Sequence, residues 1–419
     1  MTAVDFMSIM VELLNLLKGS RFDGHVFAVG GSVRDLVMQS EIKDIDLVVD
    51  IPNGGIDLAL YLDGLGCLTH KPVTYPTYGT CMFSLKKFPD VELEAVHTRG
   101  EQYHDKNSRN PETFFAGIDA DSIRRDLTIN ALYYDIFKSG IVDPTGKGMY
   151  DIAHRVIRTS NTNPNIVFDD DPLRILRVIR FSVKYGWEIE NRTKEAMELY
   201  ADRLSIISRE RITQEFVKML NTKYPGNAMR LINELGLWEV VTGFELPEDC
   251  GYKISQALDE CARCNYSFYT RLAVVFNGLS GDDCRSTLLS LKFSSKDSNH
   301  VAKIVSHLRA FGGGYDNAFI RKVQLEFSRE CFIELLNAID VLGLCYDTND
   351  IRRRVWNGEC NMFGYKLPVS GDDVIELLGV EPGVEVGRIL SDMIDLACKN
   401  PDIGKEELID FFRERLWQY

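Results

Sequence analysis

Long apolar runs are absent from this 419-residue sequence, and no stretch approaches the ~20 residues that a membrane-spanning helix needs. Residues 1–22 include Asp5 and Glu12 and carry no basic cluster ahead of their apolar stretch, so we expect no signal peptide. The 10 cysteines are scattered except for Cys261 and Cys264, a pattern that supplies neither a disulfide framework nor a two-knuckle zinc site. We therefore expect a reduced, cytoplasmic protein with no membrane partner.

A surplus of basic residues is also absent, because 48 Lys and Arg stand against 62 Asp and Glu. The net charge of −14 speaks against a nucleic-acid partner, since phosphate binding normally needs a basic surface. The acidic excess is concentrated at the two ends of the chain, however. Residues 1–150 hold 14 basic and 21 acidic residues and residues 331–419 hold 9 and 17, whereas residues 151–220 hold 12 and 11. The middle of the chain is therefore where we expect a polyanion to bind.

Strand patterns are confined to the first part of the chain, and helical periodicity dominates from about residue 151 onward. The segments with strand character are His25–Val29, Ile45–Val49, Thr80–Leu85 and Val91–Val96. Turn-forming residues interrupt the helical pattern near residues 224–226, 312–314 and 367–368. The sequence thus predicts an α+β fold with a sheet-and-helix head (1–150) followed by an all-helical neck (151–224), body (225–330) and tail (331–419).

Two acidic side chains share one face of a predicted strand. Over residues 44–49, the alternation of a strand places Asp44 and Asp46 on one side and the apolar residues on the other. Glu94 has the same position in the alternating run 91–95. If the two strands are neighbours, the three acids form an oxygen cluster that suits Mg²⁺. The alternative is a solvated polar face of the sheet.

A pair of glycines precedes these acids. Gly30 and Gly31 stand at a predicted turn from strand to helix, where glycine lets the backbone approach a ligand and a helix start attracts phosphate. Ser32 and Arg34 add a hydroxyl and a guanidinium. The segment is neither G-x-G-x-x-G nor a Walker loop, because no Gly-Lys-Ser/Thr follows. It predicts a different phosphate site beside the acids.

These features belong to an ordered series of motifs. The string GGSVRDLVMQSEIKDIDLVV (30–49) is followed by Tyr78-Gly79-Thr80 and by the segments 124–131, 143–148, 170–177, 210–215, 370–374 and 381–383. The series resembles the class II tRNA nucleotidyltransferases, the CCA-adding enzymes of the DNA-polymerase-beta-like superfamily, over nearly the whole chain. The resemblance implies a nucleotidyltransferase head and template-independent addition of C, C and A to the 3′ end of tRNA from CTP and ATP. It also implies that the helical part, including the tail, binds the acceptor arm of the tRNA.

The resemblance assigns roles to particular residues of the head. The resemblance implies two-metal nucleotidyl transfer, with Asp44 and Asp46 as ligands of the Mg²⁺ ions and Glu94 as the third catalytic acid. The implied nucleotide contacts of the head are Gly30, Gly31, Ser32, Arg34, Arg124, Asp126 and Asn130. For residues 124–130 the alternative is a helix start with solvated charges.

Base selection is expected from the predicted helix that contains Asp171 and Arg174, which stand three residues apart and hence on one face. A carboxylate beside a guanidinium matches the amino donor and ring-nitrogen acceptor of cytosine and adenine and opposes guanine and uracil. The alternative is that Asp171 caps a helix that starts at Pro172. Arg177 and Arg180 continue the row toward triphosphate or RNA, or else form a solvated charged face. Asp170 departs from the family, which has Glu at this position.

Some relatives carry a His-Asp metal site for phosphohydrolysis, but Asn277-Gly278 stand where it would lie, so we predict no such activity. His300 and His307 lie seven residues apart, a spacing typical of packed or solvated helices rather than metal sites. Two other functions stay open: a bacterial-type poly(A) polymerase or partial CC- or A-adding enzyme, and an inert RNA-binding relative. The full-length segment Gly100–Phe115 favours the complete CCA-adding enzyme.

Overall fold

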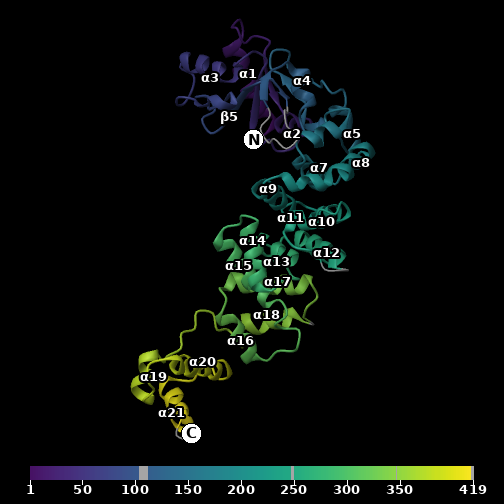
Figure 1. Ribbon diagram of the computed structural model, residues 1–419. Helices are drawn as coiled ribbons and strands as arrows, with labels where there is room; N and C mark the ends of the chain where they lie inside the picture. The colour runs from purple at the N-terminus through teal and green to yellow at the C-terminus, as the bar shows by residue number, and fades with distance from the viewer. Residues whose placement is uncertain (103–111, 247–249, 346, 417–419) are drawn as a thin grey trace. The chain divides into compact units, whose positions relative to one another are not determined.

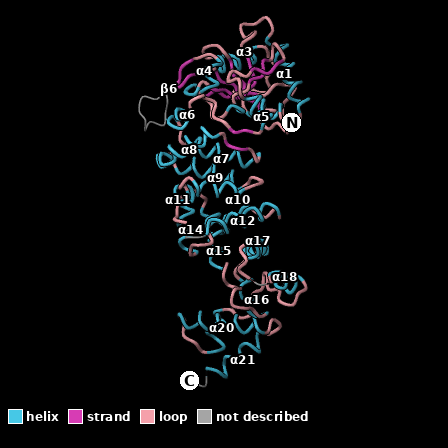
Figure 2. The backbone as a smooth tube through the Cα atoms, turned by 90° about the vertical axis from the view of Figure 1, so that its right-hand side faces the viewer, coloured by secondary structure: helices cyan, strands magenta, loops and turns pink. Residues whose placement is uncertain are grey.

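The computed structural model describes residues 1–102, 112–246, 250–345 and 347–416. The chain divides into two compact units (Figure 1), the first comprising Met1–Tyr224 with Leu231–Val241 and the second Pro225–Arg230 with Thr242–Tyr419. Every strand that the structure describes belongs to the first unit (Figure 2). The expected α+β class is therefore confirmed, whereas the four-part division into head, neck, body and tail stays a prediction.

A seven-stranded sheet forms the centre of the first unit, in the order β3-β4-β5-β2-β1-β8-β9. Its strands are β1 (Val26–Val29), β2 (Ile45–Val49), β3 (Val73–Tyr75), β4 (Thr80–Phe83), β5 (Leu93–His97), β8 (Tyr133–Asp135) and β9 (Gly140–Val142). Strands β2 and β5 run parallel, and the other neighbours pair antiparallel. The sequence predicted β1, β2, β4 and β5. It missed β3, β8 and β9, because three residues are too few to show a strand period.

The two faces of this sheet are covered differently. One face packs on α1 (Ala3–Leu17) and α3 (Gly54–Gly64) in a core that includes Phe6 of α1, Leu58 of α3 and Leu47 of β2. Helix α1 begins at a capping box between Thr2 and Asp5. The other face carries a smaller apolar cluster built on Phe27, Val29, Val48 and Tyr133. Part of that second face is therefore left for polar side chains.

Two short hairpin strands and two short helices complete the head. They are β6 (Arg99–Gln102), β7 (Glu112–Phe115), α2 (Gly31–Val37) and α4 (Ile118–Ile123). Strands β6 and β7 pair antiparallel. Residues 103–111 of the segment Gly100–Phe115 lie outside the described residues, so the expectation attached to that segment is untested.

Helices follow the head in the chain, and the last two of those named next contribute residues to both units. They are α5 (Gly148–His154), α6 (Pro164–Asp170), α7 (Leu173–Tyr185), α8 (Asn191–Tyr200), α9 (Arg209–Leu220), α10 (Pro225–Glu234) and α11 (Trp238–Thr242), with 3₁₀ turns at Pro76–Tyr78, Thr128–Asn130 and Ala201–Ile206. The neck is not entirely helical, because β10 (Val156–Ile157) and β11 (Glu188–Ile189) form a parallel pair. That pair corrects the expectation of an all-helical neck; two residues per strand leave no pattern to detect.

The second unit is helical throughout its described residues. Its helices are α12 (Cys250–Arg263), α13 (Phe268–Val275), α14 (Gly281–Ser290), α15 (Ser295–His307), α16 (Asn317–Leu325), α17 (Arg329–Val341), α18 (Thr348–Trp356), α19 (Gly371–Leu378), α20 (Val384–Lys399) and α21 (Lys405–Leu416). Serine caps explain several helix starts, since Ser267, Ser280, Ser294 and Ser328 each accept a hydrogen bond from an amide three residues on. Among the described helices, none combines the length and apolarity that crossing a membrane requires.

Candidate active site

Two acidic side chains stand next to each other on adjacent strands of the head. Strands β2 and β5 pair in parallel so that Asp46 lies beside Glu94, and Asp46 pairs with Val29 of β1 on its other side. Residues at paired positions point to the same face of a sheet. Asp44 lies one residue before β2 and, like Asp46 and Glu94, has an exposed side chain. The three predicted acids therefore gather at one exposed region of the sheet.

The pKa of the Asp46 carboxyl reflects this concentration of negative charge. Its pKa is raised to about 6, mainly because surrounding protein displaces water from the carboxyl group, although part of the side chain stays exposed. The negative charges of Glu94 and, to a smaller extent, Asp44 raise the pKa further, whereas the positive charge of Arg125 lowers it. The oxygens of the three acids do not all lie within 4.8 Å of one another in the described residues. Proteins commonly hold Mg²⁺ through one or two carboxylates, with water and substrate phosphate as the remaining ligands. The acids present fit a divalent cation of that kind.

The turn between β1 and α2 brings backbone close to these acids. Gly30 has φ +76°, a conformation that favours glycine. A Cβ at this position would lie 3.7 Å from Nη1 of Arg125 and 3.9 Å from Oδ2 of Asp46. Ser32 donates its hydroxyl to the carbonyl of Val29 at 3.1 Å and so closes the turn. A side chain at position 30 would therefore have to fit between an arginine and an acid of the site.

Arg34 points into the protein rather than toward the exposed acids. Its buried guanidinium donates from Nη1 to Oδ1 of Asn130 at 2.5 Å and forms a two-point contact with Asp35 at 2.8 and 3.0 Å. A Cβ on Gly31 would lie 3.5 Å from Nη2 of Arg34. The guanidinium also lies over the ring of Phe181 in α7, 5.3 Å from its centroid. Arg34 thus joins α2 to residue 130 and to α7, and its predicted nucleotide contact stays a prediction.

A buried carboxylate that the sequence analysis did not single out holds the arginine pair of the head. Asp121 is fully buried and accepts from Nη2 of Arg124 at 2.6 Å, from Nη2 of Arg125 at 2.8 Å and from the hydroxyl of Tyr133 at 2.7 Å. Burial alone would raise the pKa of Asp121, but the charges of Arg125 and Arg124 hold it well below its usual range. Of the two arginines, Arg125 lies beside Gly30. Its positive charge also lowers the pKa of the Asp46 carboxyl.

Asp126 connects the head to α7. Its Oδ1 accepts from the side-chain Nδ2 of Asn130 at 3.0 Å, and its Oδ2 accepts from Nη2 of Arg177 at 2.6 Å. Burial opposes ionisation, yet Arg177, Asn130 and Arg174 lower the pKa of Asp126 to about 2. The predicted residues Asp126, Asn130, Arg174 and Arg177 therefore lie in one neighbourhood.

A second buried acid extends this ion-pair network into the neck. Glu215 of α9 is buried and pairs with Nε of Arg180 at 2.5 Å and with Nη1 of Arg177 at 3.9 Å. The Arg180 guanidinium lies over Phe181 at 4.3 Å. Arg177 and Arg180 thus bind carboxylates that fix α7 to the head and to α9 rather than forming a solvated face, and their predicted contact with triphosphate or RNA stays a prediction.

Asp171 lies between two helices rather than within one. Helix α6 ends at Asp170, α7 begins at Leu173, and Asp171 has extended backbone with φ −145°. The expected helix through Asp171 and Arg174 is therefore wrong at its first turn. Asp171 accepts from the backbone amide of Leu173 at 3.1 Å and pairs with Nη2 of Arg211 at 2.7 Å. Pro172 is the N-cap residue of α7, so Asp171 contacts the start of the helix without being its cap, and its second oxygen engages an arginine of α9.

Arg174, the other residue expected to select the base, lies in the first turn of α7. It is buried, and Nη1 donates to the carbonyl of Val167 at 3.4 Å. Its charge also reaches Asp126, whose pKa it helps to lower. Asp171 is engaged by Arg211, and the shared role of Asp171 and Arg174 in base selection stays a prediction.

Sequence reasoning missed the residues that position the predicted ones. Asp121 stands three and four residues before the two arginines, a spacing at which helical side chains meet, and this was its available signal. Arg211 and Glu215 belong to the motif at 210–215, which was noted without a role. Tyr133 carried no local signal.

Comparison with known proteins fits this geometry. Residues 26–158 match the family model described as the poly A polymerase head domain, and residues 186–246 match the probable RNA and SrmB-binding site of polymerase A. The tRNA nucleotidyltransferase cca1 of Schizosaccharomyces pombe is 32% identical, over 94% of this chain and 92% of that protein. This chain belongs to the CCA-adding tRNA nucleotidyltransferases. The two matched segments of this nucleotidyltransferase leave out Asp171 and Arg174, but the alignment with the fission-yeast protein covers nearly the whole chain.

Further members of the tRNA nucleotidyltransferase family give consistent results. The CCA-adding enzyme of Bacillus pumilus is 33% identical over 52% of this chain and 52% of that protein. Among solved structures, the Bacillus stearothermophilus CCA-adding enzyme in complex with CTP superimposes with a TM-score of 0.74 at 22% identity, covering 99% of this chain and 98% of that one. At this identity the superposition shows that the fold is shared.

Proposed function

We propose that the protein adds C, C and A to the 3′ end of tRNA, using CTP and ATP, without a nucleic-acid template and with release of pyrophosphate. The observation that carries this proposal is the match over nearly the whole length of a tRNA nucleotidyltransferase. The head geometry supports it, because Asp46 and Glu94 stand in register beside Arg125. An inert RNA-binding relative would have no need to keep such a repulsive group of acids.

The catalytic step is assigned to the head. Asp44 and Asp46 would hold Mg²⁺, with Glu94 as the third acid of the site. Two Mg²⁺ ions bound there would supply a lower pKa for the attacking RNA 3′-hydroxyl and charge neutralisation for the leaving pyrophosphate. Arg125, fixed by Asp121 and close to Gly30, is placed to bind a triphosphate oxygen, and Arg124 is fixed by the same carboxylate.

Base selection is assigned to the neck. An Asp171 carboxylate accepts from the amino group of cytosine or adenine, and an Arg174 guanidinium donates to the adjacent ring nitrogen. Guanine and uracil present the reverse order, so like groups would face each other. To accept from the base, Asp171 must release one carboxylate oxygen from its ion pair with Arg211 and turn it toward the nucleotide. Discrimination should be roughly 1–3 kcal/mol, as for bidentate readout of a base.

The tRNA acceptor arm is proposed to bind the helical part, near residues 151–220 and the tail. Residues 186–246 match a probable RNA-binding segment, which supports that placement. We propose a cytoplasmic location on the basis of the scattered cysteines, while two curated relatives, from Candida glabrata and Saccharomyces cerevisiae, are named as mitochondrial. Phosphohydrolase activity is not expected.

The direct test is to incubate the protein with a tRNA that lacks its 3′ end, to offer the four nucleotides singly and together, and to sequence the products. CTP alone should add two residues, and CTP with ATP should complete CCA and stop. The shared head-domain family favours poly(A) polymerase as the second candidate. A long adenosine tail from ATP alone would identify that activity instead, and addition of only C or only A would identify a partial enzyme.

A further inference from the structure

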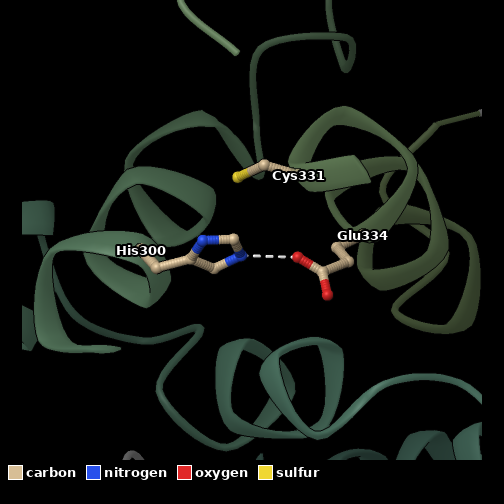
Figure 3. A group of neighbouring side chains, drawn as sticks. All are labelled: His300, Cys331 and Glu334. Atoms are coloured by element: carbon tan, nitrogen blue, oxygen red, sulfur yellow. Dashed lines mark hydrogen bonds and ion pairs between the residues drawn. The ribbon is translucent and has the colours of Figure 1, made fainter. Parts of the chain in front are cut away.

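Three side chains with different donor atoms meet in the second unit. His300 extends from α15, and Cys331 and Glu334 extend from adjacent turns of α17 toward it (Figure 3). One ligand atom from each side chain lies within 4.8 Å of the ligand atoms of the other two. Among the described residues, no other three His, Cys, Asp or Glu side chains come this close together. Nε2 of His300 lies 2.5 Å from Oε2 of Glu334.

Neighbouring residues fix two of these side chains. The other carboxylate oxygen of Glu334, Oε1, accepts from the hydroxyl of Ser267 at 2.7 Å. Tyr269 lies against the His300 ring, with centroids 4.3 Å apart, and donates its own hydroxyl to Asp297 at 2.7 Å. Partners of this kind orient metal ligands in proteins. The arrangement therefore has both the direct donors and the outer contacts of a metal site.

The surroundings give the donors a fixed and partly dry setting. Cys331 is buried, and His300 and Glu334 are half-buried, with side-chain exposures of 28% and 14%. Val301 of α15 and Phe332 of α17, each adjacent in sequence to a donor, are part of the buried core. The two helices are thus held together by apolar packing, and the donors do not have to assemble from a disordered state.

We propose that His300, Cys331 and Glu334 bind one Zn²⁺ ion that links α15 to α17. A thiolate and an imidazole favour zinc over the hard cations that suit the head acids. Three protein ligands leave the fourth tetrahedral position to water. Binding replaces the hydrogen bond between His300 and Glu334 and releases the thiol proton to solvent. The ion would stabilise this unit independently of nucleotide addition.

The chain offers matched controls. His307, on the same helix, pairs with Glu326 at 3.3 Å, and this pair is not part of any three-donor group among the described residues. Cys284 of α14 is buried, as Cys331 is. Replacing Cys284 by serine therefore measures the loss of stability that a serine hydroxyl causes in the core. His307→Asn and Cys284→Ser therefore separate the loss of a ligand from the loss of an ordinary pair or a buried thiol.

The full chain is stripped of metal with a chelator, reloaded with Zn²⁺ and desalted. Its metal content is then measured, and its affinity for zinc is determined by competition with a chromogenic chelator. We expect one zinc per chain, lost in Cys331→Ser and His300→Asn and retained in His307→Asn and Cys284→Ser. Ser267→Ala should weaken binding by roughly 10–100-fold, as for other losses of a residue that orients a metal ligand. Zinc should raise the unfolding temperature of the wild type and of the two controls only.

A second measurement keeps the proposal open to refutation if a cysteine variant does not fold. Co²⁺ added to the stripped wild type should give a thiolate charge-transfer band in the near ultraviolet, absent from His300→Asn. The proposal is overturned if the wild type takes up no more zinc than Cys331→Ser, or if cobalt shows no thiolate band. His300 and Glu334 would then be a hydrogen-bonded pair between helices.

Discussion

The acids on the head sheet and the acids at the junction of head and neck are arranged in opposite ways. On the head sheet, Asp46 stands beside Glu94, so negative charge lies next to negative charge and the pKa of Asp46 is raised. At the junction of head and neck, Asp126 and Glu215 are buried against arginines, and the pKa of Asp126 is lowered. The first arrangement costs stability unless a cation binds, whereas the second holds α7 in place. The difference separates the residues proposed to do chemistry from residues that hold their partners in position.

The largest expected effect comes from removing a head acid. Asp46→Ala or Asp44→Ala should lower nucleotide incorporation by several orders of magnitude, because the cation would lose a ligand, and should leave the affinity for tRNA and the melting temperature nearly unchanged. Single-turnover incorporation, tRNA binding and a thermal melt measure the three quantities. Glu92→Gln is the matched control, since Glu92 is exposed just before β5. A double variant that adds nucleotides at nearly the wild-type rate would exclude the assignment of these acids to the cation.

The next effect is on stability. Asp126→Asn removes the partner of Arg177 and should destabilise the protein, by less than the roughly 3–5 kcal/mol of a fully buried pair, because a third of the Arg177 side chain is exposed. Chemical denaturation at neutral pH measures the free energy of unfolding.

The same variant has a pH signature. Because the folded pKa of Asp126 is lowered to about 2, its contribution to stability is complete above the unfolded pKa of about 4 and is lost as the pH falls toward 2. The wild type should therefore lose more stability than Asp126→Asn between these pH values. Parallel curves for the two proteins would contradict the buried pair.

The smallest expected effect on stability concerns Arg211. Its pair with Asp171 is partly exposed, so Arg211→Ala should change the free energy of unfolding by under about 1 kcal/mol. It should nevertheless change KM for CTP and ATP, because Asp171 loses the contact that orients it. Arg209→Ala is the control, as Arg209 lies on the same helix and donates to the carbonyl of Val240. Equal kinetics in both variants would mean that Arg211 does not orient Asp171.

Much of the head could be predicted from local patterns. Strand alternation correctly placed Asp46 and Glu94 on one face, because a two-residue period is written directly into the sequence. The break at Asp171 was considered only as the alternative to a continuous helix, because the helical pattern on both sides of Pro172 is continuous. Partners such as Asp121 for Arg125 and Glu215 for Arg180 depend on tertiary packing, which one sequence does not specify.

The same limit applies to the second unit. His300 was interpreted from its spacing to His307, on its own helix, and that spacing indicates a packed or solvated face. The structure instead places His300 beside Cys331 and Glu334, about thirty positions later in the sequence. Groups that form between helices have no local period, so only the fold reveals them.

The central claim is that neck side chains choose the base while head acids perform the transfer. The most direct measurement is kcat/KM for all four nucleotides on Asp171→Asn, together with a thermal melt. Asparagine can still accept from the backbone amide of Leu173 but can present either its oxygen or its NH₂ to the base, so we predict an unchanged melt and weaker discrimination against UTP and GTP. Unchanged nucleotide selectivity in a folded Asp171→Asn protein would contradict the claim and place base selection elsewhere.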